Sequence, residues 1–179
     1  MVEPSGVIAL LRDAAHRFDA SPAIQEAARR SVWRGFQGGA EWMALALAEI
    51  RGSSPTRVAS GAARLGFIKY GAASLAAGVV VALAAALGRF EILPLAVVAF
   101  YAVEARSVFV FPAFADGTPD PFSASRALVA SAGGTAAVAG RTMVIASVML
   151  LGGFVRFRFL RAWCIGCLAV TLWYERLRP

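Results

Sequence analysis

Long apolar stretches after residue 65 constrain this chain more than any other feature. Three of them cover residues 67–88, 92–114 and 127–155, and a shorter fourth covers residues 162–174. About 20 apolar residues in a helix suffice to cross the hydrocarbon core of a bilayer, and a helix satisfies its own backbone hydrogen bonds there. The pattern predicts an all-α, polytopic helical membrane protein with about four membrane segments.

The composition excludes several other classes of protein. Of the 179 residues, 59% are hydrophobic without counting glycine and 16% are charged, whereas soluble domains are about 45–50% apolar with glycine counted and about 25% charged. Such a chain is neither disordered nor, with two cysteines, a disulfide-rich module. The net charge of +7 is basic, but its placement beside an apolar stretch favours a lipid surface over nucleic acid.

The basic residues indicate an orientation. Arg51, Arg57, Arg64 and Lys69 have no acidic neighbour and lead into the first apolar stretch, as cytoplasmic segments next to membrane helices do. Because the first residues contain Glu3 and no basic region, no signal peptide is expected. Richness in arginine and alanine suggests a bacterial, GC-rich source. We therefore predict a protein of the bacterial cytoplasmic (inner) membrane whose N-terminus is cytoplasmic.

Two regions follow from this reading, a cytoplasmic or interfacial helical region at 1–64 and a transmembrane helical bundle at 65–179. Within the first region, apolar residues recur on one side of residues 5–18, which predicts a short amphipathic helix. A second amphipathic helix is expected over residues 22–50, so that the region contains a pair.

The second amphipathic helix has a recognisable start and a weak middle. Ser21 followed by Pro22 is typical of an N-cap and a first helical position. Its apolar stripe has heptad spacing and consists of Trp33, Phe36, Ala40, Met43, Leu47 and Ile50. Glycines interrupt the helix at 35, 38 and 39. The stripe fits an interfacial or bundle-packing helix, and alternatively a partner-binding coiled coil.

The third apolar stretch, 127–155, is long for one span. We expect one tilted helix; the alternative is a broken, re-entrant segment hinged near Gly133-Gly134 or Gly140. The choice affects the basic connector 156–161. Four full spans would put this connector outside, against the usual distribution of positive charge, whereas a re-entrant segment would return it to the inside.

Small residues recur every four positions in the first span. Such a ridge lets another membrane helix approach closely, and it predicts helix packing rather than chemistry. Its members are Ser74, Gly78, Ala82 and Ala86.

Ionisable residues inside the predicted spans form a candidate polar site. Glu104 stands near the middle of the second span and Arg141 at the centre of the third stretch. Charges in the bilayer are costly and tend to pair inside the bundle, so we expect a Glu104–Arg141 pair. Tyr101, one turn back, is a hydrogen-bond partner, and Arg106 either joins the pair or extends to the headgroups. The site is either a structural ion pair or a place for a proton, an anion or a lipid headgroup.

Cys164 and Cys167 form a C-x-x-C pair that a helix would place on one face. A helix N-terminus lowers the pKa of a thiol, so the pair is a candidate redox centre; otherwise both are small buried apolar residues. A dithiol at the head of the last membrane helix resembles the vitamin K epoxide reductase arrangement, which implies a thiol oxidoreductase. That family also needs a shuttle cysteine pair in an outer loop. This chain has no third cysteine, so an external dithiol partner would have to replace it.

Three functions remain open from the sequence. The first is a small membrane accessory or scaffold protein that packs with a partner membrane protein or with itself. The second is a membrane thiol-disulfide oxidoreductase using Cys164 and Cys167, and the third a transporter or channel subunit organised on the Glu/Arg site. We expect no cofactor, no metal site and no nucleic-acid partner, because His16 is the single histidine and no nucleotide-binding or metalloprotease motif is present.

Overall fold

The computed structural model describes residues 5–154 and 158–178 of the chain. These residues are mostly helical, with no strand among them, which confirms the predicted helical class. The elements are α1 (Ser5–Ala20), α2 (Pro22–Ser31), η1 (Val32–Arg34), α3 (Gly35–Arg51), α4 (Ala62–Leu87), η2 (Phe90–Ile92), α5 (Pro94–Arg106), α6 (Val110–Ala115), α7 (Pro121–Ser131), α8 (Gly134–Phe154) and α9 (Phe159–Leu177).

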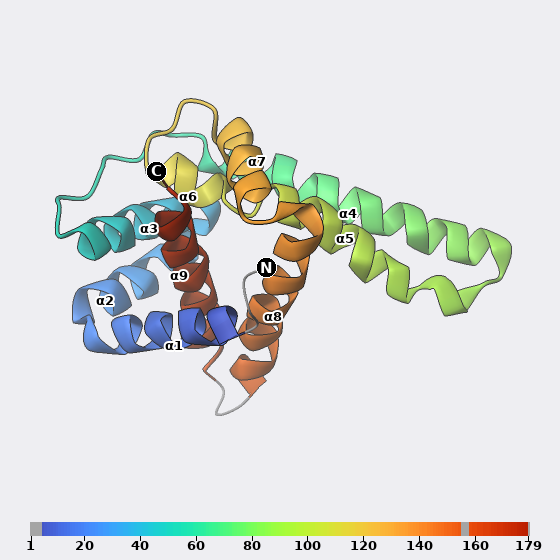
Figure 1. Ribbon diagram of the computed structural model, residues 1–179, viewed down its shortest axis with the longest axis horizontal. Helices are drawn as coiled ribbons and strands as arrows, with labels where there is room; N and C mark the ends of the chain where they lie inside the picture. The colour runs from blue at the N-terminus through green and yellow to red at the C-terminus, as the bar shows by residue number, and fades with distance from the viewer. Residues whose placement is uncertain (1–4, 155–157, 179) are drawn as a thin grey trace.

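The helices are arranged in a body and a projecting hairpin (Figure 1). Helices α1, α2 and α3 gather around α9 to form the body, and α4 pairs with α5 in a hairpin that extends away from it. Helix α8 packs against both α9 and α5. It therefore joins the body to the hairpin.

Helix α9 is the central helix of the body. It packs against α1, α2, α3 and α8, and Leu168, Leu172 and Trp173 are among its many buried side chains. Gly166 allows the close approach of α8, because a Cβ at this position would overlap the side chain of Met149. Helix α9 is thus enclosed by protein, and it contains the stretch 162–174 that we predicted as a fourth membrane segment.

Among the described residues, three segments are long and apolar enough to cross a membrane. They are Ala62–Leu87, Phe90–Ala115 and Gly134–Phe154. The structure supports a membrane protein with three candidate spans, and the predicted fourth is not confirmed.

Helix α1 directs apolar side chains into the body. Val7, Leu10, Ala14 and Phe18 are buried in the core shared with α9, whereas Ile8 is 58% exposed. These buried side chains contact protein instead of lipid, so the predicted interfacial amphipathic pair is not confirmed. The boundary between 1–64 and 65–179 stays a prediction, since one hydrophobic core contains residues from both sides of it.

The predicted helix over residues 22–50 begins as expected but is divided. The Ser21 hydroxyl oxygen accepts a hydrogen bond from the Ile24 amide at 3.2 Å, and Pro22 follows at the first helical position. At Gly35 the backbone adopts a φ of 55°, a conformation that glycine reaches without strain. The chain turns there from α2 into α3, so the single helix is wrong. Trp33, the first residue of the predicted stripe, is 90% exposed.

Two of the predicted spans are also interrupted. The stretch 92–114 breaks between α5 and α6, where the Phe109 amide donates to the Ser125 hydroxyl oxygen at 3.2 Å. The stretch 127–155 breaks between α7 and α8, where Gly133 and Gly134 have φ values of 100° and 85°. The single tilted helix is therefore wrong, and the hinge at Gly133-Gly134 is confirmed.

A charged cluster fastens the end of α9 to the rest of the body. Asp116, in the loop after α6, receives hydrogen bonds from Arg51 and from the Tyr174 hydroxyl, the latter at 2.8 Å. Arg51 also donates to Glu175 at 3.0 Å, and Arg178 pairs with Asp116 at 2.7 Å. The Asp116 side chain is only 8% exposed. Burial alone would raise the pKa of Asp116, but the hydrogen bonds and charges of Arg51, Tyr174 and Arg178 outweigh it and lower the pKa.

The lowered pKa makes a prediction about acid stability. A carboxyl whose pKa is lower in the folded state adds stability above its ordinary pKa, and the contribution is lost as the pH falls through the folded value. We expect Asp116→Asn to lower the free energy of unfolding at neutral pH by about 2 kcal/mol, as for a hydrogen bond to a charged group. The difference in stability between the variant and the parent should begin to shrink as the pH falls below ~4 and should vanish only below the lowered pKa of Asp116.

Denaturant unfolding in detergent, followed by circular dichroism across this pH range, measures the effect. The control is Glu26→Gln at an exposed carboxyl that pairs with Arg30 on the same helix, where a loss below about 0.5 kcal/mol is expected. Equal losses in both variants would contradict a special role for Asp116.

Candidate functional site

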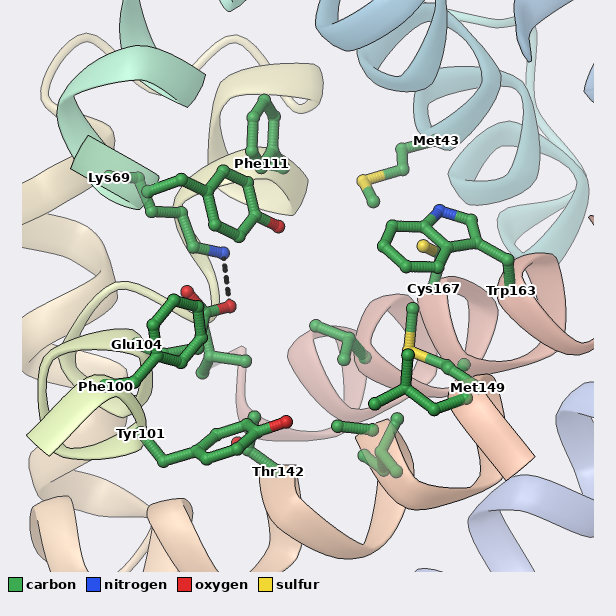
Figure 2. A pocket seen from close by; sticks show the side chains of 17 residues that line it. Met43, Lys69, Phe100, Tyr101, Glu104, Phe111, Thr142, Met149, Trp163 and Cys167 are labelled. Atoms are coloured by element: carbon green, nitrogen blue, oxygen red, sulfur yellow. Dashed lines mark ion pairs between the residues drawn. The ribbon is translucent and has the colours of Figure 1, made fainter. Parts of the chain in front are cut away.

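A pocket lies at the base of the hairpin, where α4 and α5 meet α8 and α9 (Figure 2). Its volume is about 310 Å³, at the lower end of ligand sites, which run from about 300 to about 1,000 Å³. Polar groups of Lys69, Glu104, Tyr101 and Thr142 lie together on one side in Figure 2. The opposite side presents the sulfur and aromatic groups of Met43, Met149, Trp163 and Cys167.

A buried ion pair forms part of the polar side. Lys69 Nζ on α4 lies 2.9 Å from Glu104 Oε1 on α5, and the two side chains are 4% and 10% exposed. The ammonium also lies 5.0 Å from the centre of the Tyr70 ring and 5.4 Å from that of Phe111. Both rings are close enough for cation–π attraction. The pair therefore has strong local partners and almost no contact with solvent.

Two oxygen atoms in this pocket have no hydrogen-bond partner among the described residues. They are Glu104 Oε2 and Thr142 Oγ1, and both are buried. Their residues are 8% and 6% exposed. Leaving a buried polar group unpaired costs about 1–3 kcal/mol, and more when the group is charged. The polar side of the pocket therefore has unused hydrogen-bonding capacity.

The predicted Glu104–Arg141 pair is wrong, because Lys69 occupies the position beside Glu104. The Arg141 guanidinium instead donates to the Ala132 carbonyl oxygen at 3.3 Å and lies 5.3 Å from the centre of the Trp173 ring. The break after α7 explains this contact, since the last carbonyls of a helix lack partners within it. Arg106 is exposed at the end of α5 and does not join the pocket.

Some of the other predicted site residues lie around one pocket. Tyr101 lines the same pocket as Glu104, one turn away on α5, and Cys167 lines it from α9. Cys164 lines a second pocket of about 310 Å³ beside the first, and Cys167, Met43 and Trp163 border both. The structure thus brings three of the six candidate polar and thiol residues to one cavity.

The two thiols are in an environment that suppresses their reactivity. Both cysteines are free, and they lie inside α9 rather than at its first residues. Burial raises the pKa of Cys164 to about 12. Burial also raises the pKa of Cys167 to about 12, with the neighbouring Cys164 as a smaller cause. The expected lowering of the thiol pKa by a helix N-terminus is therefore contradicted, and few thiolates are present at neutral pH.

The predicted small-residue ridge lies on the outside of the hairpin. Ser74, Gly78, Ala82 and Ala86 are all exposed on α4, and a Cβ at Gly78 would meet nothing within 4 Å. The face of α4 that contacts α5 is a different one, with Ala73 and Ala84 fully buried. The ridge is therefore not used by any described part of this chain.

In the part of the chain that the structure describes, no group of His, Cys, Asp or Glu side chains could hold a metal ion. His16 is exposed on α1. Arg156 of the predicted basic connector lies outside the described residues, and Arg161 of the same connector donates to Asp19 at 2.9 Å.

Among the residues that sequence reasoning did not assign to the pocket are Lys69, the ion-pair partner of Glu104, and Thr142. Lys69 was assigned to the basic segment in front of the first span. It is nevertheless the only lysine among 18 basic residues, and it sits between apolar neighbours. That isolation was the available signal. Thr142 carried no signal, because a threonine in an apolar helix usually bonds to its own backbone.

Comparisons with protein-family models, curated proteins and solved structures find no match to this chain.

The pairing of Lys69 with Glu104 is testable by a double-mutant cycle. Removing one partner of a buried pair leaves an uncompensated charge and costs about 3–5 kcal/mol. We expect Lys69→Met and Glu104→Leu each to destabilise the protein by that amount, and the double variant to recover most of the loss. Unfolding in detergent measures all three, with Arg141→Met as the matched alternative partner. Recovery of Glu104→Leu by Arg141→Met instead of Lys69→Met would contradict the observed pairing.

Proposed function

We propose that this protein is a small integral-membrane accessory or scaffold protein of the bacterial inner membrane, which packs with a partner membrane protein through its hairpin. The observation that carries the proposal is the unoccupied ridge of small residues on an apolar, exposed α4. Of the most apolar stretch of 18 residues in α4, only 11% is buried inside the protein. Water is a poor solvent for such a surface, so lipid and a partner helix are its natural contacts.

Helix α4 has the length of a membrane-spanning helix, and the hairpin has the polarity of a membrane insertion. Helix α4 has 26 residues, or about 39 Å at 1.5 Å per residue, against a hydrocarbon core of about 30 Å. The tip carries an exposed Arg89–Glu91 pair at 3.2 Å. The base carries the buried Lys69–Glu104 pair. Charged groups at the two ends and apolar groups between them suit a hairpin that crosses and returns.

The flanks of α8 argue against a further crossing by that helix. Helix α7, before it, contacts α6 and α9, and α9, after it, is the centre of the body. Arg161 at the start of α9 pairs with Asp19 of α1. We therefore propose that α8 stays with the body, and that body and N-terminus lie on the cytoplasmic side. This arrangement keeps Arg57, Arg64 and Arg161 on one side of the membrane.

The ridge supports a membrane-protein partner over the two alternatives. A thiol oxidoreductase needs accessible thiolates, whereas burial raises the pKa of both cysteines. A transporter or channel subunit needs a charged group that an ion or a proton can neutralise during transport. The charge of Glu104 is already neutralised by Lys69, whose Nζ lies 2.9 Å from Glu104 Oε1. We propose no nucleic-acid partner and no cofactor for the accessory role.

The accessory role is tested by cross-linking in the membrane. A photo-crosslinking amino acid at Ala82 should join the ridge to a neighbouring membrane protein in living cells. Gly78→Leu fills the ridge without a clash inside the chain. It should lower the cross-linking yield about tenfold, because overpacking a close contact costs about 1–3 kcal/mol and about 1.4 kcal/mol corresponds to a tenfold change. Quantitative mass spectrometry of the cross-linked bands gives the yield and the partner.

The control for Gly78→Leu is Ala72→Leu, at an exposed position beside the ridge on the same helix. It should leave the yield unchanged. Cross-links only to a second copy of this chain would show that the ridge mediates self-association and not binding to a different protein. Cross-links only to lipid would refute the packing role.

The proposed crossing is tested by labelling from outside the cell. In a background with Cys164→Ala and Cys167→Ala, single cysteines replace Arg89 at the hairpin tip and Ser54 before α4. A membrane-impermeant maleimide should label the Arg89→Cys protein in intact spheroplasts, because the tip lies across the membrane from the body. The Ser54→Cys protein should be labelled only after lysis. Labelling of both from one side would exclude a transmembrane hairpin.

A further inference from the structure

We propose that the pocket at the hairpin base binds an uncharged, apolar molecule that carries a hydroxyl group, and that this hydroxyl donates to Glu104 Oε2. The proposal concerns a ligand site and is independent of the partner proposed for the ridge. Three features of the pocket support it: its unpaired oxygens, its balanced charge and its apolar mouth.

The unpaired oxygens specify a donor. Glu104 Oε1 is taken by Lys69 at 2.9 Å, and Oε2 has no partner among the described residues. A carboxylate oxygen only accepts hydrogen bonds, so its missing partner must be an N–H or an O–H group. The Thr142 hydroxyl, also without a partner there, can both donate and accept. A hydroxyl or a pair of hydroxyls on the ligand would satisfy this wall.

The charge balance of the pocket excludes ions as preferred ligands. Lys69 and Glu104 neutralise each other, and no other charged side chain among the described residues lines the cavity. A ligand with a net charge would leave one charge uncompensated in an apolar enclosure, which is strongly unfavourable. A neutral donor supplies the hydrogen bond without that cost.

The rest of the pocket suits an apolar body. The wall opposite the ion pair consists of Met43, Met149, Trp163 and Cys167 (Figure 2). Polarizable sulfur and aromatic groups favour aromatic and alkyl ligand groups. Leu150 and Trp163, which also line the cavity, are 57% and 51% exposed. The mouth is therefore apolar, which suits the entry of an apolar ligand.

The decisive experiment compares two ligands that differ in a single donor. The probes are para-hexylphenol and its methyl ether, para-hexylanisole, added to the full-length protein in lipid nanodiscs. Binding is measured by isothermal titration calorimetry after subtraction of partitioning into empty nanodiscs. We expect the phenol to bind at least about tenfold more tightly, as one hydrogen bond to a charged acceptor predicts. Equal affinities, or no saturable binding of either probe, would overturn the proposal.

Three variants locate the binding. Ala146→Leu, on the pocket wall, should abolish saturable binding of both probes, whereas Ala136→Leu, on the exposed face of the same helix, should leave it intact. Glu104→Gln should reduce the preference for the phenol to near unity while the affinity for the ether stays the same. A general loss of structure would lower both affinities together, so this ratio separates recognition from folding.

The comparison remains decisive even where Glu104→Gln fails to fold, because the wild-type preference and the Ala146→Leu result do not depend on that variant. Phenol preference that survives Ala146→Leu would place the binding elsewhere and refute the site.

Discussion

The ion pair between Lys69 and Glu104 determines how the hairpin is joined to the body. Each charged group would be costly in this apolar surrounding without the other, so α4 and α5 are held in the one register that brings them within 2.9 Å. The rings of Tyr70 and Phe111 close around the ammonium. Phe111 belongs to α6 and Phe36, from α3, stacks on it with ring centres 5.7 Å apart. The contact thus extends from the hairpin into the body, and the pocket exists where these parts meet.

The apolar stretches predicted the helical class correctly because hydropathy and helix length follow directly from the residues. Their interruptions were harder to predict. Gly133-Gly134 was a visible hinge, yet only the packing of α7 against α6 and of α8 against α9 makes the break preferable to a continuous helix. Gly35 is similar, since its φ of 55° is required by the turn between α2 and α3. Glycine marks where a break is possible, and tertiary contacts decide whether it occurs.

The candidate site shows the same limit for charged residues. Glu104 was recognisable as a buried carboxylate, because a charge in the middle of an apolar run needs a partner. Its partner was not recognisable, because 18 basic residues compete for it and only the spatial arrangement of α4 against α5 selects Lys69. Likewise, residues 162–174 have the composition of a short span, but a central helix in a protein body needs the same apolar side chains. Hydropathy does not distinguish lipid from protein as the surrounding of a helix.

The central position of α9 has a consequence for biosynthesis. Helices α1, α2 and α3 leave the ribosome well before α9, the helix that they surround. Arg51 at the end of α3 must likewise wait for Glu175, 124 residues later in the chain. Until then, the apolar faces of the first helices lack their final contacts, a condition in which incomplete chains tend to aggregate. The hairpin, which we propose to insert into the membrane, consists of two helices that are neighbours in the sequence, so it can form before the body closes. If the hairpin inserts as we propose, the nascent chain is held at the membrane while the body waits for α9, and loss of α9 would leave the N-terminal helices without the contacts that they need to fold.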